Sequence, residues 1–198
     1  MISDKQNYNI QLFGIPIKSV NLKIDNSQLI SYCYNLKKEN QGLFVSNQGG
    51  WHSPILDLNN LILNSLKENI KYHLSSFVED CGIKSSLNFK IQSMWFNINK
   101  YKDYNISHNH PKNLFSGVYY LKTPKNCGNL EFINPSSHIN YDWSPEIIKN
   151  YNNINSVLYT LPIKKNLLYL FPSWAFHSVK PNLNKREDRI SIAFNISI

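Results

Sequence analysis

The feature that most constrains the fold is a change of pattern near residue 88. From there on, the sequence consists of short segments rich in β-branched and aromatic residues, separated by turn residues at close intervals. We expect strands at 89–98, 115–121, 130–133, 157–161, 167–171 and 189–196. No helical pattern separates these segments, which is typical of a β-sandwich or jelly-roll. The sequence therefore predicts a mainly β fold.

The residues before this point mix a short strand with two helices. The pattern predicts a strand over 10–17 and a helix over 27–38 with Ser27 as its N-cap. It predicts a second helix over 54–80, which Gly82 ends. Apolar residues recur on one face of that helix at Leu58, Leu61, Ile62, Leu66, Ile70, Leu74 and Phe77. Both helices are expected to pack on the outside of one sheet.

Length and composition favour one folded domain over residues 1–198, with a strand and helix part at 1–87 and a jelly-roll core at 88–198. No linker rich in Pro, Gly or Ser divides it. The polar segment 134–155 is expected to be a long loop, serving as a lid or as a plain surface insertion.

Composition also indicates the cellular compartment and the kind of partner. No apolar stretch is long enough to cross a membrane, and the first 13 residues do not resemble a secretory signal. Three separated cysteines without a CxxC pair favour a reducing, cytoplasmic compartment. The net charge of +8 is dispersed, which argues against a nucleic-acid partner. A small molecule or a peptide is the expected substrate.

Three histidines are candidate metal ligands. In an extended segment His108 and His110 face the same way, so both imidazoles can reach one ion. A third histidine, His177, lies in the second of two apolar segments that a Pro-Ser turn separates. Twelve residues later, Arg189 opens a strand with Ser191 on the same face. A buried arginine needs an anion, either a ligand carboxylate or a protein carboxylate such as Glu131.

Taken together, these residues resemble the 2-oxoglutarate/Fe(II) oxygenase superfamily, and most closely a family of such oxygenases found in bacteria and their phages. The matching stretches run in order from residue 46: Ser46-Asn-Gln-Gly-Gly-Trp-His-Ser53, Trp95-Phe-Asn-Ile-Asn99, His108-Asn-His-Pro111, Ser116-Gly-Val-Tyr-Tyr-Leu121, Phe171-Pro-Ser-Trp174, His177-Ser-Val179 and Arg189-Ile-Ser-Ile-Ala-Phe-Asn195. The resemblance implies a double-stranded β-helix, the jelly-roll of cupin-like proteins.

The resemblance also assigns roles to single residues. It implies metal ligands at His108, His110 and His177, and a 2-oxoglutarate site made by Arg189, Ser191, Asn97, Asn99 and Tyr120. Trp51, His52 and Trp95 are weaker candidates for the substrate side. His110 stands where the superfamily has a carboxylate ligand, so Glu131 or Asp103 is an open alternative for the third ligand.

The implied activity is that of a dioxygenase which uses Fe(II), 2-oxoglutarate and O₂, hydroxylates a substrate and releases succinate and CO₂. Two other functions stay open. One is a cupin-like metalloenzyme that uses three histidines without 2-oxoglutarate, and the other is a jelly-roll binding module without catalysis. Arg189 discriminates the dioxygenase from the cupin-like enzyme, because in the cupin-like enzyme it would have no anion to hold. The binding module is expected to contain no iron after purification and to form no succinate.

Overall fold

Two antiparallel β-sheets, two α-helices and two short 3-10 helices make up the described part of the protein. The computed structural model describes residues 12–136 and 143–198. Its elements are β1 (Lys18–Asn21), α1 (Ser27–Glu39), β2 (Asn47–Gln48), β3 (Trp51–His52), η1 (Leu61–Leu63), α2 (Asn64–Asp80), β4 (Lys90–Asn99), β5 (Tyr104–His108), β6 (Phe115–Lys122), β7 (Leu130–Ile133), η2 (Pro145–Ile147), β8 (Leu158–Leu161), β9 (Leu167–Pro172), β10 (His177–Val179) and β11 (Arg189–Ser197).

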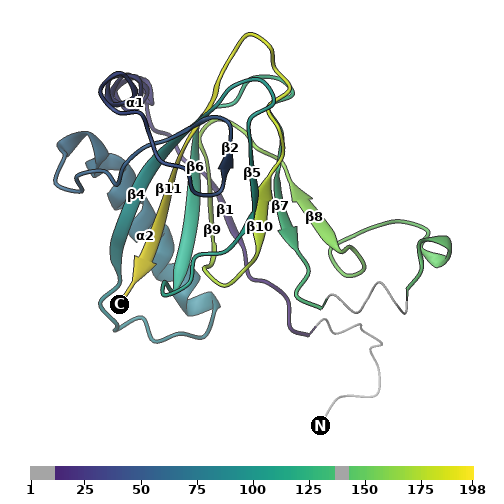
Figure 1. Ribbon diagram of the computed structural model, residues 1–198. Helices are drawn as coiled ribbons and strands as arrows, with labels where there is room; N and C mark the ends of the chain where they lie inside the picture. Colours follow the sequence, from purple (N-terminus) through teal and green to yellow (C-terminus); the bar gives the residue numbers. More distant parts are fainter. Residues whose placement is uncertain (1–11, 137–142) are drawn as a thin grey trace.

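The strands form a six-stranded sheet in the order β1-β9-β6-β11-β4-β3 and a five-stranded sheet in the order β2-β5-β10-β7-β8. Both helices lie on the outer face of the larger sheet, and the smaller sheet covers its inner face (Figure 1). This arrangement confirms the predicted jelly-roll of the double-stranded β-helix type, with the helices on one sheet.

The alternation along β11 explains this layering. Ile190, Ile192 and Phe194 are fully buried in the main core, together with residues of the two helices. Their neighbours Arg189 and Ser191 face the opposite way, into a cavity between the sheets. One face of the larger sheet therefore anchors the helices, and the other carries the polar groups of the site.

A second, smaller core lies between the two sheets. It joins Val118 and Tyr120 of β6 and Phe171 of β9 to Leu130 and Phe132 of β7. These side chains hold the sheets together beside the cavity. The site is therefore built on packed strands, which fix side-chain positions more closely than loops do.

The expected strands after residue 88 are all present within a few residues, and 130–133 has the predicted bounds. The N-terminal predictions need correction. Of the strand predicted over 10–17, residues 10 and 11 lie outside the described residues and residues 12–17 are not a strand, so the first described strand begins at Lys18. The N-cap of α1 is Asn26 and not Ser27. Residues 54–60 are not helical, and α2 begins only at Asn64.

Local hydrogen bonds explain the late start of α2. The side chain of Asp57 accepts from the amide of Asn59, and that of Asn60 accepts from the amide of Ile62. Such short-range bonds satisfy the backbone without a helix. Leu61 consequently lies outside the buried stripe and is exposed, whereas Leu66, Ile70, Leu74 and Phe77 are buried as expected.

Two further expectations concern loops and membranes. Part of the predicted loop 134–155, residues 137–142, lies outside the described residues, and the rest contains only η2. None of the described helices combines the length and the apolar character that a membrane crossing requires.

Candidate functional site

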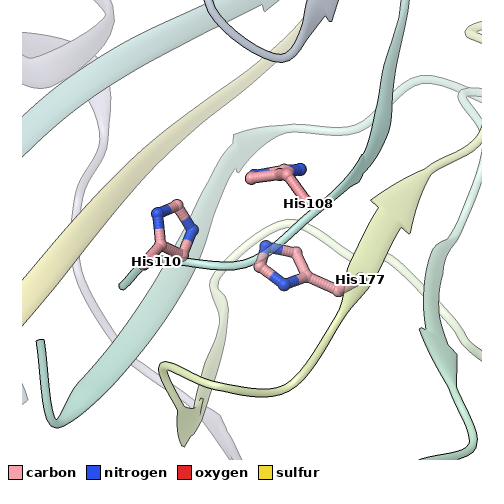
Figure 2. A group of neighbouring side chains, drawn as sticks. All are labelled: His108, His110 and His177. Carbon is pink, nitrogen blue, oxygen red and sulfur yellow. The ribbon is translucent and has the colours of Figure 1, made fainter. Parts of the chain in front are cut away.

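Three histidines converge between the two sheets. His108 ends β5, His110 follows it by two residues, and His177 begins β10. The sheet register pairs His108 directly with His177, and their ring centroids are 4.4 Å apart. One nitrogen of each of the three rings lies within 4.8 Å of the others. Figure 2 shows the rings turned toward one another, as ligands of a common ion would be.

Backbone carbonyls fix the tautomers of two of these rings. The Nδ1 of His108 lies 2.8 Å from the carbonyl oxygen of Ile106, and the Nδ1 of His177 lies 2.9 Å from that of Ala175. A carbonyl can only accept, so each Nδ1 carries the proton and each Nε2 keeps a free lone pair. Both histidines are therefore oriented as Nε2 metal ligands by bonds of the kind that support ligating histidines elsewhere.

Burial keeps the cluster neutral. Desolvation, followed by the neighbouring His108, lowers the pKa of His177 to about 3 and that of His110 to about 4. Burial also lowers the pKa of His108. Neutral imidazoles are the form that binds a metal ion, so protons do not compete for these nitrogens at neutral pH.

Aromatic rings surround the cluster. The ring of Phe171 lies 4.8 Å from that of His177 on one side. On the other side, Trp95 lies 5.7 Å from His110 and stacks on His52, with ring centroids 5.5 Å apart and an angle of 13° between the planes. The Nδ1 of His52 donates to the carbonyl of Ser53 over 2.7 Å. His52 and Trp95 thus lie beside the cluster, and their role on the substrate side stays a prediction.

The residues predicted to bind 2-oxoglutarate lie on neighbouring strands of the larger sheet. Asn97 pairs with Ser191, and Ser191 pairs in turn with Tyr120. Two positions further along, Asn99 pairs with Arg189. Paired positions carry their side chains on the same face of a sheet, and all five residues line the cavity that holds the histidines.

Arg189 is the largest fully buried side chain of the described residues, with 1 % of its surface exposed. Its Nη1 donates to the carbonyl of Lys180 over 2.8 Å and to the carbonyl of Cys127. Its Nη2 has no hydrogen-bond partner among the described residues, and neither has the hydroxyl of Tyr120, which is also 1 % exposed. The same cavity therefore contains two buried hydrogen-bond donors that a ligand acceptor can satisfy.

The two carboxylates considered as alternative third ligands are occupied elsewhere. Glu131 forms an ion pair of 3.1 Å with Lys180 and accepts from the hydroxyl of Thr160. Asp103 accepts from the amide of Lys100 over 2.7 Å. Among the described residues, the metal-ligand cluster contains only the three histidines. This geometry favours His110 as the third ligand, and it also leaves Arg189 without the protein carboxylate that Glu131 would have supplied.

One predicted site residue needs correction. Trp51 does not line the cavity, because it pairs with Ile98 and packs in the core beneath the helices. Its Nε1 donates to the carbonyl of Asn40 over 3.0 Å. Successive residues of a strand face opposite ways, so β3 can direct only one of its two residues inward, and that residue is His52.

The cavity has a volume of about 420 Å³, within the range of small-molecule sites. The sequence did not predict several of its lining residues, chiefly Leu43, Val45, Ile55, Asn105 and Ile106. The first three come from irregular segments without periodicity. Asn105 and Ile106 belong to β5, where the position of His108 at the strand end was the available signal.

Comparisons with known proteins agree with this site. Residues 93–195, just over half of the chain, match the model of a family described as "Putative 2OG-Fe(II) oxygenase". That range contains the three histidines, Arg189 and their supporting strands. A search of curated proteins found no match.

Solved structures share the fold at low sequence identity. A prolyl-4-hydroxylase of Pseudomonas putida is 14% identical with a TM-score of 0.62, and 93% of each chain is covered. A viral collagen prolyl hydroxylase from Paramecium Bursaria Chlorella virus-1, in complex with 2-oxoglutarate, is 13% identical with a TM-score of 0.61, covering 92% of this chain and 96% of that one. HygX from Streptomyces hygroscopicus, with nickel and 2-oxoglutarate bound, is 9% identical with a TM-score of 0.61, covering 91% and 82%. With the family match, the cluster of three histidines and this shared fold, the chain belongs to the 2OG-Fe(II) oxygenase family.

Proposed function

We propose that this protein is a 2-oxoglutarate- and Fe(II)-dependent dioxygenase that hydroxylates a substrate and releases succinate and CO₂. The observation that carries the proposal is the pair of unpartnered donors, Arg189 Nη2 and the Tyr120 hydroxyl, in the cavity of the three histidines. Leaving such donors buried without a partner costs about 1–3 kcal/mol each. A carboxylate ligand would satisfy both of them.

The surroundings of Arg189 suit the far carboxylate of 2-oxoglutarate. The two backbone carbonyls that accept from Nη1 hold one side of the guanidinium plane and leave Nη2 for a ligand. A planar guanidinium binds a carboxylate more strongly than neutral donors do. Burial raises the pKa of Tyr120, which keeps its phenol protonated as a donor. Ser191 and Asn97 add a hydroxyl and an amide at the neighbouring positions.

The histidines suit the metal. His108 and His177 offer Nε2 atoms with fixed lone pairs, and His110 completes a set of three nitrogen donors that iron accepts. When bound, Fe(II) with 2-oxoglutarate supplies the oxygen chemistry that protein side chains lack. The chain's own part is to hold both groups, to orient the substrate beside His52 and Trp95, and to exclude water with Phe171 and its neighbours.

The test is an anaerobic titration of the protein with Fe(II) and then 2-oxoglutarate, followed by absorbance. 2-Oxoglutarate bound to Fe(II) would give a weak visible metal-to-ligand charge-transfer band. The wild-type protein should show this band. His177→Ala should lose it at all concentrations, and Arg189→Ala should require far more 2-oxoglutarate to form it.

Matched controls exist in the same chain. Arg186 is exposed on the loop before β11, and His73 lies on α2 on the far side of the larger sheet. Arg186→Ala and His73→Ala should both keep the wild-type band. Circular dichroism of every variant separates loss of ligand binding from loss of fold.

The same titration separates the rival functions. Iron that binds without a band, together with an Arg189→Ala variant that behaves like wild type, would favour a three-histidine metalloenzyme independent of 2-oxoglutarate. A protein that binds neither iron nor 2-oxoglutarate would favour a jelly-roll module without catalysis. For a protein that shows the band, substrate-dependent succinate formation would establish turnover with 2-oxoglutarate, and a product heavier by one oxygen atom would establish hydroxylation.

A further inference from the structure

The charge of the cavity points to the class of substrate. Among the described residues that line it, Arg189 is the single charged side chain and none is acidic. Neither of the acidic residues considered above as ligands lines the cavity. Glu131 is paired with Lys180. The carboxylate of Asp103 accepts from the backbone amide of Lys100, and its influence on the pKa of Arg189 is smaller than those of burial, Tyr120 and Cys127. The cavity therefore carries positive charge that no carboxylate in its lining offsets.

Binding of the two cofactors does not neutralise the cavity. This step rests on the proposed function. Imidazoles bind metal in their neutral form, so the three histidines contribute no charge. Fe(II) carries two positive charges and Arg189 one, whereas 2-oxoglutarate carries two negative charges. The loaded cavity therefore keeps one excess positive charge. An uncompensated charge in a low-dielectric site is costly, so a ligand that carries one negative charge gains free energy there.

The mouth of the cavity has a different character. Leu43, Val45, Ile55 and Ile106, which we name the apolar lip, line the cavity and are each 43–61 % exposed. They come from three segments: 43–45, the segment around Ile55, and β5. Backbone hydrogen bonds hold the first and the third segment beside the site. Leu43 donates to the carbonyl of His52, and Ile106 donates to that of Ser46. Exposed apolar side chains gathered at a pocket entrance mark a surface for an apolar ligand.

We propose that the substrate is an amphipathic carboxylate, with its anionic head in the cavity and its apolar chain across the apolar lip. A single carboxylate offsets the single excess positive charge, whereas a phosphate monoester would overcompensate it. The net charge of +8 on the whole chain also favours the approach of an anion. The polar cavity and the apolar lip are thus two parts of one binding surface.

The test compares two probes that differ only in charge, octanoate and octanamide. Each is titrated anaerobically into protein loaded with Fe(II) and 2-oxoglutarate, and binding is read from the shift of the charge-transfer band. Octanoate should bind about tenfold more tightly than octanamide or better, as expected for one unit charge near an excess charge. His110→Asp removes the excess charge with a ligand that iron accepts, and should abolish the preference.

A second pair of variants tests the apolar lip. The double variant Val45→Ser and Ile55→Ser should weaken octanoate and octanamide by the same factor, about tenfold, because it removes apolar contact and leaves the charge unchanged. Ile147→Ser is the matched control, since Ile147 is exposed outside the cavity and should leave both affinities unchanged.

The outcomes distinguish this inference from the proposed function. If no band forms before the probes are added, the proposed function fails. If the band forms but octanamide binds as tightly as octanoate, or if neither probe shifts it, the substrate class is wrong. If octanoate removes the band and added 2-oxoglutarate restores it, octanoate competes for the Arg189 site, and that result also overturns the inference.

Discussion

His108 and His177 are direct partners across β5 and β10, with ring centroids 4.4 Å apart. The register of the smaller sheet thus brings together two ligand candidates that lie 69 positions apart in the sequence. In each case a carbonyl two residues earlier holds Nδ1 and leaves Nε2 for the metal. The pairing of β5 with β10 therefore creates the candidate metal site.

Removal of one of these rings should abolish tight metal binding. His177→Ala should raise the dissociation constant for Fe(II) or Co(II) by roughly a hundredfold or more, because loss of a direct ligand exceeds the 10–100-fold cost of losing its support. Equilibrium dialysis under argon measures the constant. His73→Ala should bind metal as the wild type does, and an equal loss in both variants would contradict the assignment.

The metal-free protein should lose stability in mild acid. Burial holds the pKa of His177 at about 3, far below the ordinary value of 6.5, so the unfolded chain binds a proton that the native chain does not. Above pH 6.5 His177 is neutral in both states, so it does not change the free energy of unfolding. As the pH falls below 6.5, proton binding to the unfolded chain alone lowers the free energy of unfolding. At pH 5 the loss from His177 alone is about 2 kcal/mol.

Urea unfolding at pH 7.5 and pH 5 tests this linkage. His177→Gln removes the titrating group, so the difference in unfolding free energy between the two pH values should shrink by about 2 kcal/mol. An unchanged difference would show that His177 is not held neutral in the native state.

Tyr120→Phe should affect stability and ligand affinity in opposite directions. The hydroxyl has no partner among the described residues, so its removal should leave the metal-free protein as stable or up to about 1 kcal/mol more stable. The affinity for 2-oxoglutarate should fall roughly tenfold, because a hydrogen bond to a charged carboxylate is lost. Calorimetry with and without 2-oxoglutarate measures both. A loss of stability with unchanged affinity would make the hydroxyl structural.

Gly128 should be essential to the position of Arg189. Its φ is +86°, and an added Cβ would lie 2.8 Å from Arg189 Nη1 and still closer to the carbonyl oxygen of Lys180. Gly128→Ala should therefore destabilise the protein by about 1–3 kcal/mol and weaken 2-oxoglutarate binding. Gly82→Ala is the control, because Gly82 has a φ of +68° but nothing within 4 Å. It should cost stability without changing 2-oxoglutarate affinity.

Much of the fold could be predicted because alternation and turn residues are local signals. Except for β5 and β10, the strands from β4 onward carry them, and β11 shows why they also indicate function. Its apolar face fills the core, so Arg189 and Ser191 had to face the other way. The start of α2 could not be predicted, because the side chains of Asp57 and Asn60 replace helical bonds by local ones.

The rest of the site depends on contacts between distant segments. Nothing in the periodicity of residues 43–55 indicates that Leu43, Val45 and Ile55 meet Ile106 at one entrance. The two-residue strand β3 was too short to show which of Trp51 and His52 faces inward, and the pairing of β3 with β4 decides it. Chemistry-bearing residues on long strands were therefore predictable, whereas the shape of the mouth was not.

The most direct test of the central claim is a crystal structure of the protein grown anaerobically with Fe(II) and 2-oxoglutarate, with the iron located by anomalous diffraction. We expect iron bound by the Nε2 atoms of His108 and His177 and by the ring of His110, and a 2-oxoglutarate carboxylate on Arg189 Nη2 and the Tyr120 hydroxyl. Iron on Asp103 or Glu131, or a 2-oxoglutarate molecule that leaves Arg189 untouched, would contradict it.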